Sequence, residues 1–176
     1  MFKKAGVFVL LIAVIIIVGA ESHSKEPGEG SGAPKRSVVA SDTILSGMIR
    51  ALLPSERYSV GAILPPGQCP GHYDVKLSDI EKTKEADLIV SFRGMPFMNR
   101  AALSGGTQLV MESGGRNWMA PDSYMKGLRI VAEGLSERFP DDTDEIIRRR
   151  DGEIRRVERT AEALAGKIRD AGIWGK

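Results

Sequence analysis

Short apolar runs alternate with segments of helical periodicity along the central part of the chain. Four of these runs predict strands, at residues 37–41, 58–64, 87–92 and 107–111. Helices are predicted at residues 43–53, 79–86, 96–103 and 121–139. Nearly continuous apolar strands are typical of a parallel sheet covered by helices on both faces. The pattern therefore predicts an α/β lobe with a four-stranded parallel sheet and flanking helices.

Local signals mark where several helices begin. Asp42 is a predicted N-cap of the first helix, and Pro54 follows that helix and stops it. Ser78 and Glu81 have the spacing of a capping box, with Ser78 as the cap. Pro121 opens the helix after the fourth strand.

One long amphipathic helix is predicted at residues 142–171, within a C-terminal segment at 141–176. Ile147, Ile154, Ala161 and Ile168 recur at intervals of seven residues along it. Acidic residues cluster at its start and Lys167 and Arg169 lie near its end, which matches the helix dipole. The helix is longer than a small domain can cover, so we expect a second lobe or self-association to cover its far half.

The N-terminus has the features of an export signal. Lys3 and Lys4 precede an apolar run at residues 5–20, which fits a cleaved signal peptide or an uncleaved anchor. No cysteine lies at the end of this run, which argues against a lipid anchor. Residues 21–36 are polar and rich in Gly and Pro, as in a flexible tether, and His23 within them is expected to be solvated. The lobe at 37–140 is therefore expected outside the cytoplasm.

Composition narrows the classes of function. The net charge of +2 gives no electrostatic footprint for nucleic acid. The sequence contains no nucleophile–base–acid set, no Walker loop and no dinucleotide fingerprint. We therefore predict neither an enzyme nor an organic cofactor.

The loop at residues 65–74 holds the single cysteine, Cys69, and one of the two histidines, His72. A single cysteine forms no disulfide within its own chain, and an unpaired thiol is unusual in an exported protein. Thiolate and imidazole are preferred ligands of zinc and similar ions, so both residues are candidate metal ligands. The alternative for His72 is a polar loop residue that is hydrogen-bonded to a neighbouring carbonyl.

Ligands of an open parallel sheet bind beyond the carboxyl ends of its strands. The loops expected there are residues 41–42, 68–74, 93–95 and 113–121. The last loop is either a binding loop or a simple turn before the helix at Pro121. The candidate ligand-contacting residues in these loops are Asp42, Asp74, Arg93, Arg116, Asn117 and Trp118.

Several motifs in this order resemble the zinc- and manganese-binding solute-binding proteins of ABC uptake systems. They are residues 38–41, Pro66-Gly67 with Tyr73-Asp74, residues 78–80, residues 86–90 and residues 118–121. The resemblance implies a divalent metal ion as the transported ligand, with zinc favoured, and an ABC permease as partner. It also implies that the terminal helix connects this N-terminal lobe to a second lobe that is absent from the chain, as in a truncated product. The alternative is an exported structural or adhesive module that dimerises through its C-terminal helix.

The chain departs from that family's metal-binding pattern in three places. Gly71 stands where the family's first-loop histidine falls, with His72 one position later. Cys69 stands where the family has aspartate, and Arg116 stands where the family has its second-loop histidine. The departures predict that a Cys-Pro-Gly-His loop replaces the two-histidine lobe.

Overall fold

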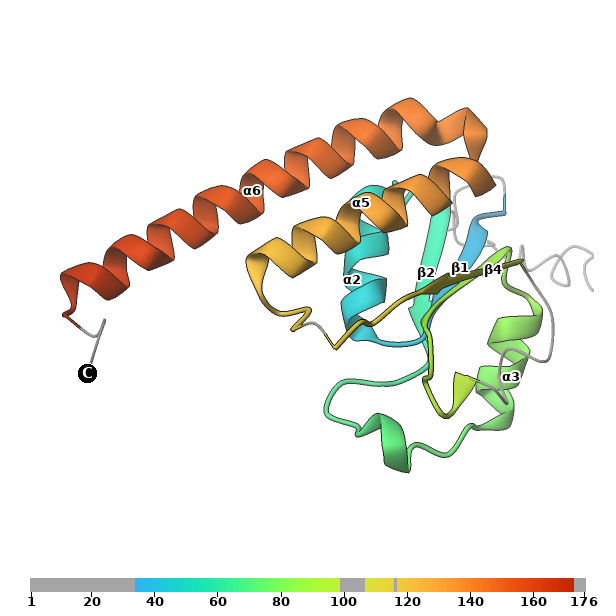
Figure 1. Cartoon of the computed structure of the whole chain (residues 1–176). Helices are drawn as coiled ribbons and strands as arrows, with labels where there is room; N and C mark the ends of the chain where they lie inside the picture. The colour runs from blue at the N-terminus through green and yellow to red at the C-terminus, as the bar shows by residue number, and fades with distance from the viewer. Residues whose placement is uncertain (1–33, 99–106, 116, 173–176) are drawn as a thin grey trace, which may run out of the picture. The chain divides into compact units, whose positions relative to one another are not determined.

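The computed structural model of the chain describes residues 34–98, 107–115 and 117–172. Four strands form one parallel sheet in the order β2-β1-β3-β4 (Figure 1). They are β1 (Arg36–Ala40), β2 (Tyr58–Ala62), β3 (Leu88–Phe92) and β4 (Thr107–Met111). The parallel four-stranded sheet predicted from the apolar runs is confirmed, although β2 ends at Ala62, two residues before the predicted end.

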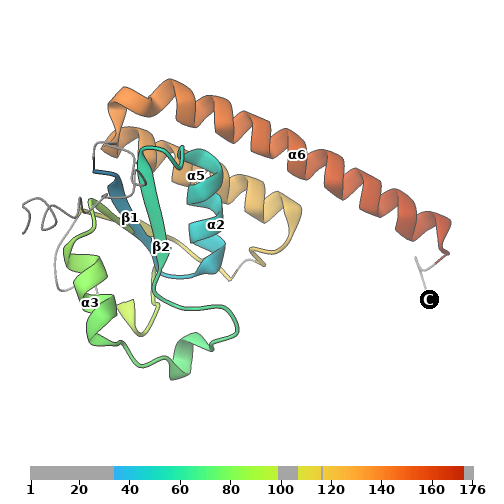
Figure 2. The same cartoon turned by 180° about the vertical axis from the view of Figure 1, so that it is seen from behind.

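Helices cover both faces of the sheet, as Figures 1 and 2 show. The helices are α2 (Thr43–Leu52), α3 (Leu77–Lys84), α5 (Pro121–Arg138) and α6 (Thr143–Asp170), with short 3-10 turns η1 (Pro70–His72) and η3 (Pro140–Asp142). Helices α2 and α5 and the first half of α6 lie on one face, and α3 lies on the other. The predicted flanking helices and long C-terminal helix are confirmed.

Successive residues of the two central strands point to opposite faces, so each strand serves two cores. Val38 and Val90 pack with α2, α5 and the start of α6. Val39 and Ile89 pack in a smaller cluster on the other face. All five residues of β3 are buried, which explains why its sequence is apolar without alternation.

The first turn of α3 differs from its prediction. Helix α3 begins at Leu77, so Ser78 is inside the helix and is not its cap. The carboxylate of Asp79 instead accepts a hydrogen bond of 3.0 Å from the backbone N–H of Lys76. Asp79 also accepts a hydrogen bond of 2.7 Å from the hydroxyl of Tyr73. The helix therefore starts two residues earlier than the capping signal indicates, with Lys76 in place of Ser78 at the N-cap.

The apolar residues of α5 and α6 are not all buried. Ile130 and Ile147 are each 38% exposed, whereas Leu128, Val131 and Ile146 are fully buried. After Ile154, no described residue of α6 is buried. The far half of the helix therefore lies uncovered in the described structure, as its length suggested.

Several predictions fall outside the described residues. These are the export signal at 1–20, almost all of the tether at 21–36, most of the helix at 96–103, and Arg116. Among the described helices, none combines the length and apolar character needed to cross a membrane.

Candidate functional site

A cavity of about 500 Å³ opens at the carboxyl edge of the sheet. All four strands lead into segments that line it, so its position follows from the parallel topology, as expected for a ligand site of this architecture. Its lining residues are Asp42, Thr43, Ile44, Leu64, Gln68, Pro70, Phe92, Arg93, Gly94, Met95, Pro96, Ser113 and Trp118. We call this space the edge cavity.

Asp42 is a buried carboxylate that caps α2 at the edge cavity. One carboxylate oxygen, Oδ1, accepts hydrogen bonds from the backbone N–H groups of Ile44 and Leu45, at 2.9 and 3.1 Å. The other, Oδ2, accepts a hydrogen bond of 2.7 Å from the hydroxyl of Ser41. The predicted N-cap is confirmed, and the cap commits both oxygens of Asp42 to the protein itself.

Trp118 forms an apolar wall of the edge cavity. Its ring lies 4.9 Å from that of Phe92, centroid to centroid, and only 8% of the residue is exposed. The indole packs over Gly127 of α5, where an added Cβ would lie 2.8 Å from Cζ3 of Trp118. Its Nε1 is buried without a hydrogen-bond partner in the described structure. Trp118 thus packs in the core and also lines the edge cavity, and its role as a ligand contact stays a prediction.

Arg93 supplies a positive charge at the rim of the edge cavity. Its guanidinium pairs with Glu112, and both side chains are mostly exposed. The backbone N–H of Arg93 donates a 2.8 Å hydrogen bond to the carbonyl of Met111 and so fixes the start of the loop. Because an exposed ion pair contributes little free energy, Arg93 can exchange Glu112 for an anionic ligand at small cost.

In the Cys-Pro-Gly-His loop, Cys69 and His72 do not line the edge cavity, although Pro70 between them does. Cys69 and His72 bracket η1, and the backbone N–H of His72 donates a 3.1 Å hydrogen bond to the carbonyl of Cys69. Both residues are exposed, and Pro70 between them reaches the lining. The two side chains are therefore accessible to a ligand or to another chain.

The segment after this loop is anchored to the body of the lobe by Tyr73. Burial and the hydrogen bond to the Asp79 carboxylate raise the pKa of Tyr73 to about 12. Its ring packs on that of Phe97 with the centroids 5.4 Å apart. Asp74 lines a separate cavity of about 180 Å³ next to this contact. The loop thus has a fixed base.

The structure brings together three of the predicted ligand contacts, Asp42, Arg93 and Trp118. Asn117 is exposed and uses its Oδ1 to accept a 3.0 Å hydrogen bond from the backbone N–H of Met119, as in a turn. Within the described residues, no three His, Cys, Asp or Glu side chains gather in a way that could hold a metal ion. The metal role of Cys69 and His72 stays a prediction.

Several residues that line the edge cavity were not among the predicted ligand contacts. Leu64 and Phe92 lie at or just beyond strand ends, and Thr43 and Ile44 lie in the first turn of α2. Their apolar or neutral side chains carry no chemical signal of a site. Only the expected convergence of strand ends could have identified them.

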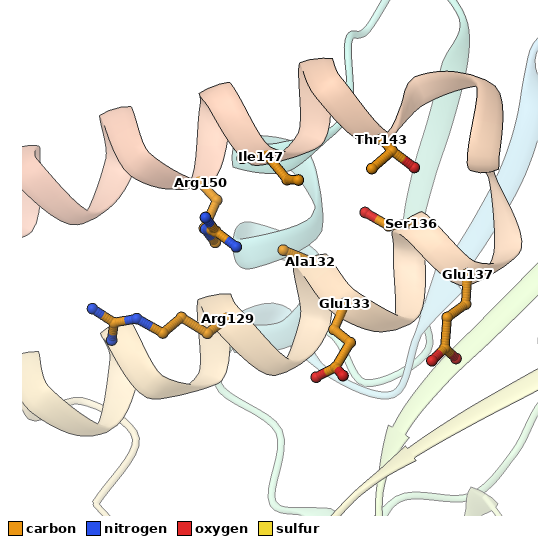
Figure 3. Close-up of a pocket in the computed structure, with 8 residues that line it drawn as sticks. All are labelled: Arg129, Ala132, Glu133, Ser136, Glu137, Thr143, Ile147 and Arg150. Atoms are coloured by element: carbon orange, nitrogen blue, oxygen red, sulfur yellow. The ribbon is translucent and has the colours of Figure 1, made fainter.

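A second cavity, of about 670 Å³, lies between α5 and α6 (Figure 3). Ala132 and Ile147 contribute its apolar surface, and Arg129 and Arg150 project from the two helices at one end. Its lining includes Ile147, which explains why this residue is exposed although it belongs to the predicted apolar seam.

Comparisons with known proteins identify the relatives of this fold. No family model matches the chain. A manganese ABC transporter substrate-binding lipoprotein, PsaA of Streptococcus mitis, is 35% identical over 88 residues, which are 49% of this chain and 27% of that protein. The chain resembles the substrate-binding proteins of metal ABC transporters. A second such relative, the metal ABC transporter lipoprotein ScbA of Streptococcus cristatus, is 28% identical over 80% of this chain and 44% of its own length.

Solved structures of metal-binding proteins share this fold at low sequence identity. The zinc-bound ZnuA-like domain of Streptococcus pneumoniae AdcA matches with a TM-score of 0.62 and 15% identity, over 76% of this chain and 55% of its own. The manganese-bound periplasmic metal binding protein of candidatus liberibacter asiaticus matches with a TM-score of 0.65 and 16% identity, over 76% and 57%. The chain thus spans little more than half of these structures and less than half of the two relatives described above. The predicted resemblance to metal substrate-binding proteins is confirmed.

Proposed function

We propose that this chain is the N-terminal lobe and connecting helix of an extracytoplasmic component that binds a metal ion for an ABC importer. The observation that carries the proposal is the 35% identity over 88 residues with a manganese substrate-binding lipoprotein. The parallel sheet, its edge cavity and the long helix α6 are consistent with it. In this role the chain is not an enzyme, and its partner is a permease in the membrane.

Cys69 and His72, beside the edge cavity, would coordinate the metal ion. A thiolate and an imidazole favour zinc over manganese, which prefers oxygen donors. Stable zinc sites have three or four protein ligands, so two residues alone would give weak binding. The remaining donors would come from a second lobe or from another chain, and the uncovered half of α6 is where such a lobe would pack.

Calorimetric titration of the purified full chain with zinc and with manganese tests the proposal. Replacement of a ligand should lower zinc affinity about tenfold or more, so His72→Ala and Cys69→Ala should each weaken binding. His23→Ala is the matched control, because His23 is the other histidine and lies in the predicted tether. An unchanged isotherm for both His72→Ala and Cys69→Ala would contradict the assignment.

The rival interpretation is an adhesive module that dimerises through α6, with Cys69 forming an intermolecular disulfide. None of the relatives described above carries a name of that kind. Electrophoresis without reductant separates the two interpretations, because a dimer that disappears in Cys69→Ser would favour the module.

A further inference from the structure

The lining of the edge cavity is mainly apolar and aromatic, which is unusual for a surface that meets only a hydrated ion. Phe92 and Trp118 pack against each other in its wall, with their rings tilted by 39°. The other apolar side chains in the lining are Ile44, Leu64, Pro70, Met95 and Pro96. Water forms few hydrogen bonds with an apolar surface. An apolar group that displaces this water therefore binds with a favourable free energy that grows with the area buried.

The size of the edge cavity also fits a ligand with an apolar organic part. Its volume of about 500 Å³ is within the usual range for pockets that hold small organic molecules, roughly 300–1,000 Å³. A water molecule occupies about 30 Å³ of liquid, so a cation with one shell of six waters would fill well under half of this space. The cavity therefore has room for an organic body in addition to an ion.

The polar groups of the lining suit a ligand with an anionic group at one edge. Arg93 is exposed at the rim and forms an exposed ion pair with Glu112. Asp42, in contrast, already accepts three hydrogen bonds from Ser41, Ile44 and Leu45. A carboxylate has about four acceptor positions, so Asp42 has little capacity left to serve as a metal ligand.

We infer that the edge cavity binds a metal ion as an organic chelate, with the apolar body of the chelator against Phe92 and Trp118 and its anionic oxygens toward Arg93. This inference rests on the proposed function, since it specifies the form in which the metal arrives. The chelator supplies most of the metal donors, and Cys69 and His72 beside the cavity complete the coordination. The ion then needs fewer protein ligands than a bare cation would.

Quinoline-2-carboxylate provides a test, because it combines a flat aromatic body with a carboxylate and binds zinc. The full chain is titrated calorimetrically with zinc alone, with quinoline-2-carboxylate alone and with the zinc complex. The complex is expected to bind at least tenfold more tightly than either component. Ser113→Phe, which fills the cavity from its half-buried lining, should weaken the complex tenfold or more, whereas Ser78→Phe on the exposed surface of α3 should not.

Circular dichroism of each variant shows whether it folds. Should Ser113→Phe not fold, Arg93→Glu is the second variant, because it changes an exposed side chain and places a negative charge where the carboxylate is expected. It should also weaken the complex tenfold or more.

The outcomes separate this inference from the proposed function. If zinc alone binds as tightly as the complex and Ser113→Phe changes neither, the inference falls and the metal-binding proposal stands. If quinoline-2-carboxylate binds equally well with and without zinc, the cavity takes organic molecules and the chelate inference fails, whereas the metal-binding proposal is decided by the titration with zinc alone. If neither the complex nor zinc binds, both are overturned.

Discussion

The hydroxyl of Tyr58 donates a hydrogen bond to the carboxylate of Asp142, although the two residues lie 84 positions apart in the sequence. Asp142 is 5% exposed and also accepts a hydrogen bond from the guanidinium of Arg57. Tyr58 begins β2, and Asp142 ends the turn that leads into α6. The contact therefore fixes the base of the long helix to the edge of the sheet opposite the cavity.

Asp142→Asn is expected to lower the free energy of unfolding by about 1–3 kcal/mol, because it removes a charge-assisted acceptor from a buried site. Asp141→Asn is the matched control, since Asp141 is adjacent but exposed, and it should change stability by less than about 0.5 kcal/mol. Urea unfolding followed by circular dichroism measures both. Equal effects of the two substitutions would show that the Tyr58 contact adds nothing.

Alkaline pH should destabilise the lobe through its tyrosines. Burial and the bond to Asp142 raise the pKa of Tyr58 to about 12, and burial and Asp79 do the same for Tyr73. An unfolded tyrosine has a pKa of about 10, so the stabilisation by each phenol is complete below pH ~10 and is lost as the pH rises toward 12. Unfolding free energies measured between pH 8 and 12 should fall over that window, and by less in Tyr58→Phe.

An absorbance titration gives an independent check of the tyrosines. The chain has three tyrosines, and the pKa of the third, Tyr124, is also raised, mainly by burial. The phenols of Tyr58 and Tyr73 should therefore stay protonated at pH 10 while the protein remains folded, and Tyr124 should be less ionised than a free tyrosine. A full equivalent of phenolate at that pH, with the native circular dichroism retained, would contradict the assignment.

Gly127→Ala should destabilise the packing of α5 against α2. A Cβ at this position would lie 2.8 Å from both Met48 Cε and Trp118 Cζ3, and the indole ring has little room to move away. Overpacking of this kind costs about 1–3 kcal/mol. Gly152→Ala is the control, because a Cβ there meets no atom within 4 Å and the change should stabilise α6 by about 0.5–1 kcal/mol. Thermal unfolding of the two variants should shift in opposite directions.

The two halves of α6 should respond differently to truncation of an apolar side chain. Ile146 is fully buried, so Ile146→Ala should cost about 2–5 kcal/mol. Leu164 is 57% exposed, and Leu164→Ala should change the unfolding free energy by less than about 0.5 kcal/mol. A large cost for Leu164→Ala in denaturant titrations would mean that this part of the helix is covered in solution, by a second copy or by another chain.

The sheet could be predicted because its signals are local. The apolar runs are bounded by Pro, Gly and capping residues, and Asp42 caps α2 as its sequence position indicates. The start of α3 could not be predicted in this way, because Tyr73 and Asp79 meet only once the chain has folded. Likewise Ile147 fits the helical apolar pattern, yet it lines the cavity between α5 and α6 and is partly exposed.

The location of the candidate site could be predicted from the sequence, whereas the residues that line it could be predicted only in part. Parallel strands direct their following loops to one edge, which placed Asp42, Arg93 and Trp118 together before the fold was known. The same reasoning placed Cys69 and His72 at that edge, but it could not reveal that the 3-10 turn holds them outside the lining. Side-chain direction within a loop depends on turn geometry that no spacing rule supplies.

The strand order has a consequence for the order in which the lobe can assemble during synthesis. Strand β1 lies between β2 and β3, and its pairing with β3 joins Val38 to Leu88. Strand β1 is synthesised first, and about fifty more residues must follow before β3 can pair with its second edge. The hydrogen bond between Tyr58 and Asp142 can form only later still. Until then an apolar strand with an open edge is exposed to other chains, so an exported protein of this design benefits from remaining unfolded until its translation is far advanced.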